Sequence, residues 1–131
     1  MDILERQALL KTDRNPDTKL DYVSSLNARI DLGQNGILNV ALRYVPDRLI
    51  LCPDTFSLYL EALSDIEWNS LEKVAAVILN DVNNVLIARW VQLSVTSPQN
   101  KGEAGVDHAV LLEDRQPNWD NPSLLSRLNA Y

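Results

Sequence analysis

The chain has one cysteine, Cys52, and one histidine, His108. Side chains of these types can perform covalent or acid–base chemistry. Cys52 opens the string Cys-Pro-Asp-Thr at residues 52–55. A cysteine acts as a nucleophile where a neighbouring base or cation favours its thiolate. Nothing near Cys52 in sequence supplies a histidine or lysine, and the N-terminus of a following helix would help only weakly. We interpret Cys52 as a small apolar residue at a strand-to-helix junction, with a reactive nucleophile as the alternative.

His108 shares one face of a predicted strand with Val106, Val110 and Leu112. A lone histidine in such company is more often a packed residue than a catalyst, which is the other interpretation. Four polar residues late on a predicted helix lack the spacing of a calcium loop and are expected to be solvated or at an interface: Asn80, Asp81, Asn83 and Asn84. The tryptophans are expected to fill core or subunit contacts rather than to form a stacking platform: Trp68, Trp90 and Trp119.

The composition describes one compact acidic domain. The chain has 131 residues, and 46% of them are apolar, which suits a single core. Its formal charge of −6 repels phosphate backbones, and no cluster of Lys or Arg offsets it, so we expect no nucleic-acid partner. One cysteine and one histidine exclude an intrachain disulfide and a zinc site made by this chain alone. No apolar run is long enough to span a bilayer, so we expect a cytoplasmic protein without a membrane partner.

Alternation of apolar and polar residues predicts a pair of strands. The first strand begins at Tyr22, and its apolar side chains continue to Leu32. Residues 33–36, Gly-Gln-Asn-Gly, follow it, and the Asn-Gly pair predicts a tight hairpin turn with positive φ angles. The next alternating run should pair antiparallel with the first and continue to about Leu51. We expect a bend at Pro46-Asp47, because proline cannot donate to a strand ladder.

Helical spacing follows these strands. The stretch Pro53–Thr55 is a helix start signal, with proline in the first turn and Asp or Thr as the cap, and the helix should end near Asp65. A second helix begins near Asn69 and keeps the 3.6-residue spacing to Leu86. The remaining elements are expected as short helices at Ile3–Lys11 and Pro122–Ala130 and as strands at Arg89–Thr96 and Val106–Glu113, joined by a polar loop at Ser97–Gly105.

The order of these elements predicts an α+β fold. Two strands, two helices and two strands give four antiparallel strands with both helices on one face of the sheet. We divide the chain into an N-terminal arm at 1–20, the sheet-and-helix domain at 21–116, and a tail with a short helix at 117–131. The sheet edges are long and not obviously protected by proline or lysine, so we expect association through them.

Four segments of the domain form a recognisable pattern: GQNGILNVALRYVPDRLIL, FSLYLEAL, ILNDV and ARWVQL. From about Ala28 to Gly102 the chain resembles the QueF family, the NADPH-dependent 7-cyano-7-deazaguanine reductases of queuosine biosynthesis, within the tunnelling-fold superfamily. The resemblance implies a homo-oligomeric ring in which strands form a barrel. It also implies that planar purine-like or pterin-like rings bind between subunits.

The reductase chemistry of that family does not carry over to this chain. In the family, a catalytic cysteine opens the stretch C-P-x-T-G-Q-P-D, and the aspartate seven residues later handles protons. Aligning its G-Q on Gly33-Gln34 places Arg29 at the cysteine and Gly36 at the aspartate. An arginine cannot form the thioimide, and a glycine has no side chain to move a proton. The resemblance therefore implies a relative without nitrile reductase activity.

The NADPH motif of the family also departs here. The segment that carries a glutamate and lysines in the family falls on residues 52–59, where Cys52 replaces the glutamate and Asp54 and Ser57 replace lysines. Losing two cations and gaining an anion disfavours a dinucleotide phosphate. The late Arg-Gly-Gly element has at most Lys101-Gly102 as a remnant. We predict no cofactor, and NADPH only if the chain is a divergent reductase.

One binding residue of the family has a counterpart. In the family, a His-Glu pair at the start of the second helix holds the amidine edge of the purine, and anchoring on ILNDV places Glu72 at the glutamate and Leu71 at the histidine. A carboxylate can accept from the two adjacent N–H groups of such an edge. Asn69 with Glu72 also has the spacing of an N-terminal capping box, which needs no ligand. Both interpretations of Glu72 stay open.

Two functions follow from these observations. The first is a QueF-like homo-oligomer without reductase activity that binds a purine-like or pterin-like ring through Glu72 at subunit interfaces, or that acts structurally. The second is an enzyme of purine or pterin chemistry, such as a divergent 7-cyano-7-deazaguanine reductase, with Cys52 and His108 as catalytic candidates. A plain interaction module would instead be a monomer.

Overall fold

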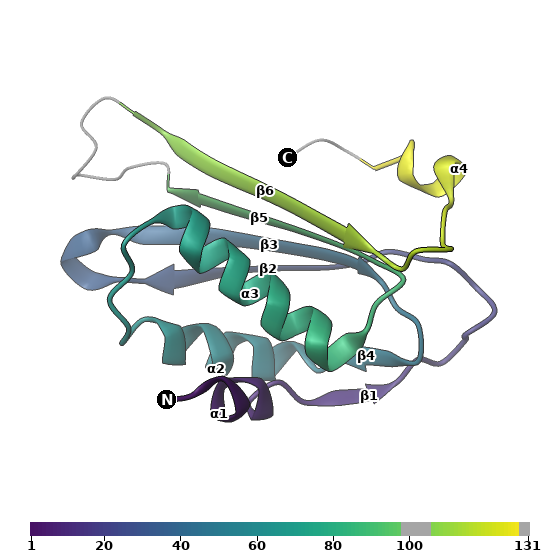
Figure 1. Cartoon of the computed structure of the whole chain (residues 1–131), viewed down its shortest axis with the longest axis horizontal. Coiled ribbons are helices and arrows are strands. Elements are labelled where there is room, and N and C mark those ends of the chain that lie inside the picture. The colour runs from purple at the N-terminus through teal and green to yellow at the C-terminus, as the bar shows by residue number, and fades with distance from the viewer. Residues whose placement is uncertain (98–105, 129–131) are drawn as a thin grey trace.

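The computed structural model describes residues 1–97 and 106–128 and shows an antiparallel sheet with helices on one face (Figure 1). The strands lie in the order β2 (Ser24–Asp31), β3 (Ile37–Val45), β5 (Trp90–Ser97) and β6 (His108–Arg115). Helix α2 (Pro53–Leu63) contacts β2, and the longer helix α3 (Leu71–Leu86) contacts β5 and β6. The predicted α+β class and the predicted order of these elements are confirmed. Among the described residues, no helix is long and apolar enough to cross a membrane.

The alternating pattern correctly predicted which side chains face the helices. In β3, Leu38, Val40 and Leu42 are buried, whereas Ile37 and Asn39 on the other face are exposed. The register of the ladder brings apolar residues of neighbouring strands onto the same face. The core therefore lies between the sheet and the two long helices, where burial of apolar surface supplies the main favourable term in folding.

The hairpin between β2 and β3 is longer than the predicted tight turn. Residues 32–36 separate the paired residues Asp31 and Ile37, and the 3₁₀ helix η1 (Gly33–Asn35) lies within this loop. The positive φ angles are those of Gly33 (66°) and Gly36 (94°), and Asn35 has none. The prediction of an Asn-Gly turn is therefore wrong, because the loop places glycines at both positions that need the left-handed region.

The second predicted strand is two separate strands. β3 ends at Val45, before the proline, and β4 (Leu49–Leu51) pairs with β1 (Thr12–Arg14) in a small second sheet. The predicted bend at Pro46-Asp47 is present, but the prediction that one strand continues through it to about Leu51 is wrong, because the chain turns away from the main sheet after Val45. Leu10, which precedes β1, is buried in the core. The division of the chain at residue 20 stays a prediction.

The remaining elements lie close to their predicted positions. The N-terminal helix α1 spans Ile3–Ala8, and the C-terminal helix α4 spans Pro122–Leu125. The predicted polar loop and its Lys101-Gly102 remnant lie outside the described residues, apart from Ser97, which ends β5.

Asp81 does not have the solvated setting that the sequence suggested. Its side chain is 1% exposed and accepts hydrogen bonds from Tyr59 Oη at 2.6 Å, Arg6 Nε at 2.9 Å and Gln7 Nε2 at 3.1 Å. The helical pattern of α3 could not reveal this, because α1 comes from the other end of the chain to cover this side of α3. Asp81 thus joins α1, α2 and α3 through one carboxylate.

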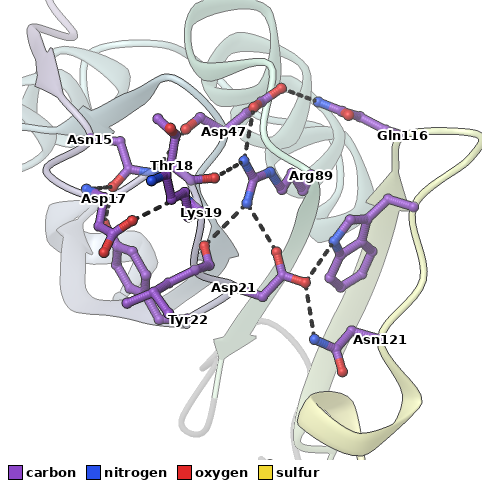
Figure 2. A network of polar contacts seen from close by, with 12 residues as sticks. Asn15, Asp17, Thr18, Lys19, Asp21, Tyr22, Asp47, Arg89, Gln116 and Asn121 are labelled. Carbon is purple, nitrogen blue, oxygen red and sulfur yellow. Dashed lines mark hydrogen bonds and ion pairs between the residues drawn. The ribbon is translucent and has the colours of Figure 1, made fainter.

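A second polar network surrounds Arg89, which follows α3 (Figure 2). Its guanidinium donates to the carboxylates of Asp21 at 3.0 Å and Asp47 at 3.3 Å. It also donates to the backbone carbonyls of Thr18 at 2.7 Å and Leu20 at 3.1 Å. These bonds to a charged donor fix the loop before β2 against the turn that follows β3.

The C-terminal segment joins the same network (Figure 2). Asp21 Oδ2 accepts from Asn121 Nδ2 at 3.0 Å and from Trp119 Nε1 at 3.2 Å, and Gln116 Nε2 donates to Asp47 Oδ2 at 3.0 Å. The arm, the domain and the tail that the sequence suggested therefore meet around Arg89 and its two carboxylate partners.

Candidate functional site

A pocket of about 470 Å³ opens at one end of the sheet, where the β2–β3 hairpin, the α2–α3 connection and the ends of β5 and β6 meet. The β2–β3 hairpin contributes Leu32 and Asn35, the α2–α3 connection contributes residues 64–70, and the ends of β5 and β6 contribute Ser97 and His108. A volume of this size is in the range of small-molecule sites, which are commonly concave and lined by a few well-placed polar groups. This pocket is our candidate site.

Glu72 lies in the first turn of α3 and is not used to cap it. The N-cap is Ser70, whose side chain accepts from the backbone N–H of Lys73 at 3.1 Å. The predicted capping box of Asn69 and Glu72 is therefore wrong, because the helix begins one residue later than that box requires. The Glu72 carboxylate is 63% exposed, and its Oε2 lies 3.2 Å from Nε2 of His108.

His108 comes to this place from the start of β6. It is paired with Ser97 across the β5–β6 ladder and is on the face of the sheet that carries the helices. Its side chain is half-buried and lies in the pocket wall rather than within the apolar core. The structure therefore brings together Glu72 and His108, which the sequence considered separately.

Cys52 lies far from this pair. It is the N-cap residue of α2, whereas the pocket is at the C-terminal end of that helix. The helix has 11 residues, which corresponds to a length of about 16 Å. Cys52 is half-buried, and its backbone N–H donates to the Lys11 carbonyl at 2.9 Å. Within one chain, Cys52 cannot act together with Glu72 and His108.

The two positions aligned with the family's cysteine and aspartate also lie outside the pocket wall. Arg29 is exposed on the face of β2 that points away from the helices, where it lines a second hollow of about 480 Å³ with Asn27 and Asn39. Gly36 ends the β2–β3 hairpin. Neither residue contributes to the 470 Å³ pocket.

Asp65, Glu67 and Trp68 line the pocket and were not identified as site residues from the sequence. The Trp68 indole is partly buried, and its Nε1 donates to the Leu63 carbonyl at 2.9 Å, which fixes the ring at the end of α2. The sequence predicted core or subunit packing for Trp68. An aromatic residue within the short polar connection between two helices was the one available signal.

The site offers hydrogen-bonding and aromatic groups rather than metal ligands. In the described ranges, no three His, Cys, Asp or Glu side chains converge as they would around a metal ion. The arrangement can accept hydrogen bonds at Glu72, orient that carboxylate through His108 and contact a flat ring at Trp68.

This sheet, with its helices on one face, is an α+β fold of the QueF-like tunnelling type. The chain is similar to the crystal structure of the archaeosine synthase QueF-Like in the apo form, with a TM-score of 0.53 and 18% sequence identity, over 72% of this chain and 90% of that chain. At this identity the similarity establishes the fold alone, since function depends on the site. No protein-family model and no curated protein sequence matches the chain.

Proposed function

We propose that this chain is a QueF-like tunnelling-fold protein that binds a planar purine-like or pterin-like heterocycle and does not reduce nitriles. The observation that supports this most directly is the Glu72–His108 contact of 3.2 Å beside a pocket of about 470 Å³. Glu72 is released from capping and is exposed, so its carboxylate is available to a ligand.

Binding would use three side chains in different ways. The Glu72 carboxylate accepts from two adjacent N–H groups on the edge of the ring. His108 holds that carboxylate in place, because a donated Nε2–H fixes one of its oxygens. Trp68 offers an aromatic surface in the pocket wall, where a flat ring can pack against it.

The loss of reductase activity follows from the groups that are missing. Arg29 and Gly36 occupy the aligned positions of the nucleophile and the proton carrier, and Cys52 lies at the opposite end of α2 from the pocket. Without a thiolate beside the ring, the covalent adduct of nitrile reduction cannot form. We propose no cofactor.

We also propose that the chain assembles with itself in the cytoplasm. β2 and β6 are the outer strands of the main sheet, and each is paired on one side only within the part of the chain described. Unpaired strand edges are templates for association. Light scattering over a concentration series should give a mass that is a multiple of 14.8 kDa. A monomer at all concentrations would contradict the proposed assembly.

Thermal unfolding with a panel of ligands tests the binding function. The panel contains guanine, 7-cyano-7-deazaguanine, pterin and NADPH. At one hundred times its dissociation constant, a bound ring should stabilise the protein by about 2.7 kcal/mol. Glu72→Gln should abolish the shift, whereas Glu61→Gln, at an exposed position on α2, should retain it. No shift with any ring would overturn the proposal.

A divergent reductase is the second candidate, because Glu72 and His108 together could exchange protons with a substrate. The decisive assay follows NADPH absorbance in the presence of 7-cyano-7-deazaguanine. We expect no consumption above that of the Glu72→Gln variant. Nitrile-dependent consumption by the wild-type protein would replace our proposal with this candidate.

A further inference from the structure

The described part of the pocket wall carries acidic side chains and no lysine or arginine. Asp65 and Glu67 line the pocket, and Glu72 lies beside it. Neither Asp65 nor Glu67 is paired with a cation among the described residues, and the described part of the wall contains no lysine or arginine. Among the wall residues that the structure describes, His108 is the one other titratable side chain.

The helix dipoles do not offset this charge. The C-terminal end of α2 and the N-terminal end of α3 both reach the pocket, through Ser64 and Ser70. Their partial charges have opposite signs and similar size, so they largely cancel. The segment 98–105, outside the described residues, contains Lys101 and Glu103, and its formal charge is zero.

We infer that this pocket selects uncharged heterocycles and rejects the same rings when they carry a carboxylate or a phosphate. The inference rests on the proposed function: Trp68 and Glu72 would hold the ring, and Asp65 and Glu67 would repel an anionic substituent. Both carboxylates are exposed, which weakens the repulsion through solvent screening. Two such charges at pocket distances still change affinity by about tenfold at low salt.

Two matched pairs of ligands separate charge from size. The first is 7-cyano-7-deazaguanine with 7-carboxy-7-deazaguanine, and the second is 6-hydroxymethylpterin with pterin-6-carboxylate. Titration calorimetry at about pH 7 keeps the ligand carboxylates ionised and the N–H edge of both kinds of ring protonated. In whichever ring class binds, we expect the neutral member to bind about tenfold more tightly, with a smaller difference at high salt.

In the variant Asp65→Asn/Glu67→Gln, the anionic ligand should bind more tightly, because the repulsive charges are gone. Its affinity should then lie within about threefold of the affinity of the neutral ligand. The control Glu5→Gln/Glu61→Gln changes the net charge equally at exposed positions on α1 and α2, and should keep the wild-type preference. Equal or tighter binding of the anionic member by the wild-type protein would overturn the inference alone. Failure of every ring to bind would overturn the proposed function and the inference together.

Discussion

Glu72 and His108 are 36 positions apart in sequence and meet on the surface beside the pocket. Their side chains are 63% and 29% exposed, and an ion pair or hydrogen bond in such a setting stabilises a protein by at most about 1 kcal/mol. The contact between Glu72 and His108 therefore contributes little to stability. Binding of a ligand that needs an oriented carboxylate explains the contact better.

This argument predicts a separation between stability and binding at His108. His108→Ala should change the free energy of unfolding by less than about 1 kcal/mol, because its contact with the exposed Glu72 carboxylate is screened by solvent. The same change should weaken binding of the heterocycle about fivefold, because Glu72 loses the group that orients it. Urea unfolding and calorimetry measure the two effects, with His108→Gln as a variant that can still donate a hydrogen bond and should recover part of the affinity. Equal affinity in all three proteins would contradict the positioning role.

Asp81 has the opposite balance, because its side chain is buried and three groups donate to it. Asp81→Ala should lower the free energy of unfolding by about 3 kcal/mol, since Arg6 and Tyr59 lose their partner inside the protein. Asn84→Ala, at an exposed position on the same helix, should stay within about 0.5 kcal/mol of wild type. Similar urea unfolding curves for the two variants would show that the Asp81 cluster contributes little.

At the scale of elements, α2 begins with a weak cap. Cys52 is its N-cap residue, and the cysteine side chain makes no capping hydrogen bond. Cys52→Ser should stabilise the protein by about 0.5 to 1 kcal/mol, because a hydroxyl oxygen can accept from a free N–H of the first turn. Heterocycle binding should be unchanged, since Cys52 is at the far end of the helix. A loss of binding in Cys52→Ser, with Cys52→Ala as the comparison, would return Cys52 to the site.

The sequence predicted elements better than it predicted their junctions. Strand alternation and helical spacing located β2, α3 and β6 to within a few residues, because one face of each is apolar. The end of β3 at Val45 and the pairing of β4 with β1 were missed, since both depend on where a distant segment lies. The same limit applies to Asp81, whose partners Arg6 and Gln7 are at the N-terminus.

The candidate site was predicted only in part, because its contacts also depend on segments that are distant in sequence. A family resemblance indicated Glu72, while its contact with His108 depends on the packing of α3 against β6 and has no local signal. The placement of Ser70 as the helix cap excludes the capping box of Asn69 and Glu72, and ligand binding by Glu72 stays a prediction. Trp68 lines the pocket because the C-terminal end of α2 and the N-terminal end of α3 lie at the same end of the sheet, which the sequence alone does not show.

At the scale of the whole molecule, the Asp21 carboxylate links the C-terminal segment, through Trp119 and Asn121, to Arg89 of the domain. Burial raises the pKa of Asp21, but hydrogen bonds from Asn121, Arg89 and Trp119 outweigh it, so the pKa lies below the ordinary value of 3.8. Hydrogen bonds from Arg115 and Trp90 likewise lower the pKa of Glu113. A carboxyl with a lowered folded pKa stabilises the protein above its unfolded pKa, and this contribution disappears as the pH falls through the folded pKa.

The free energy of unfolding should therefore decrease as the pH is lowered below about 4, with part of the decrease due to Asp21. Asp21→Asn should be less stable than wild type at neutral pH, and the difference should shrink in acid. Urea unfolding between neutral and acidic pH measures this, and Asp13→Asn, on the exposed surface of β1, is the control. A difference that stays constant across the series would show that the charge of Asp21 does not contribute.

The central claim is that a planar heterocycle binds beside Glu72 in a homo-oligomer of this chain. A crystal structure of the assembled protein with 7-cyano-7-deazaguanine or a pterin tests this claim most directly. We predict electron density for the ring at a subunit boundary, with its N–H edge within hydrogen-bond distance of the Glu72 carboxylate and its face near Trp68. Density for the ring at another place, or a subunit boundary that leaves Glu72 in open solvent, would contradict the account.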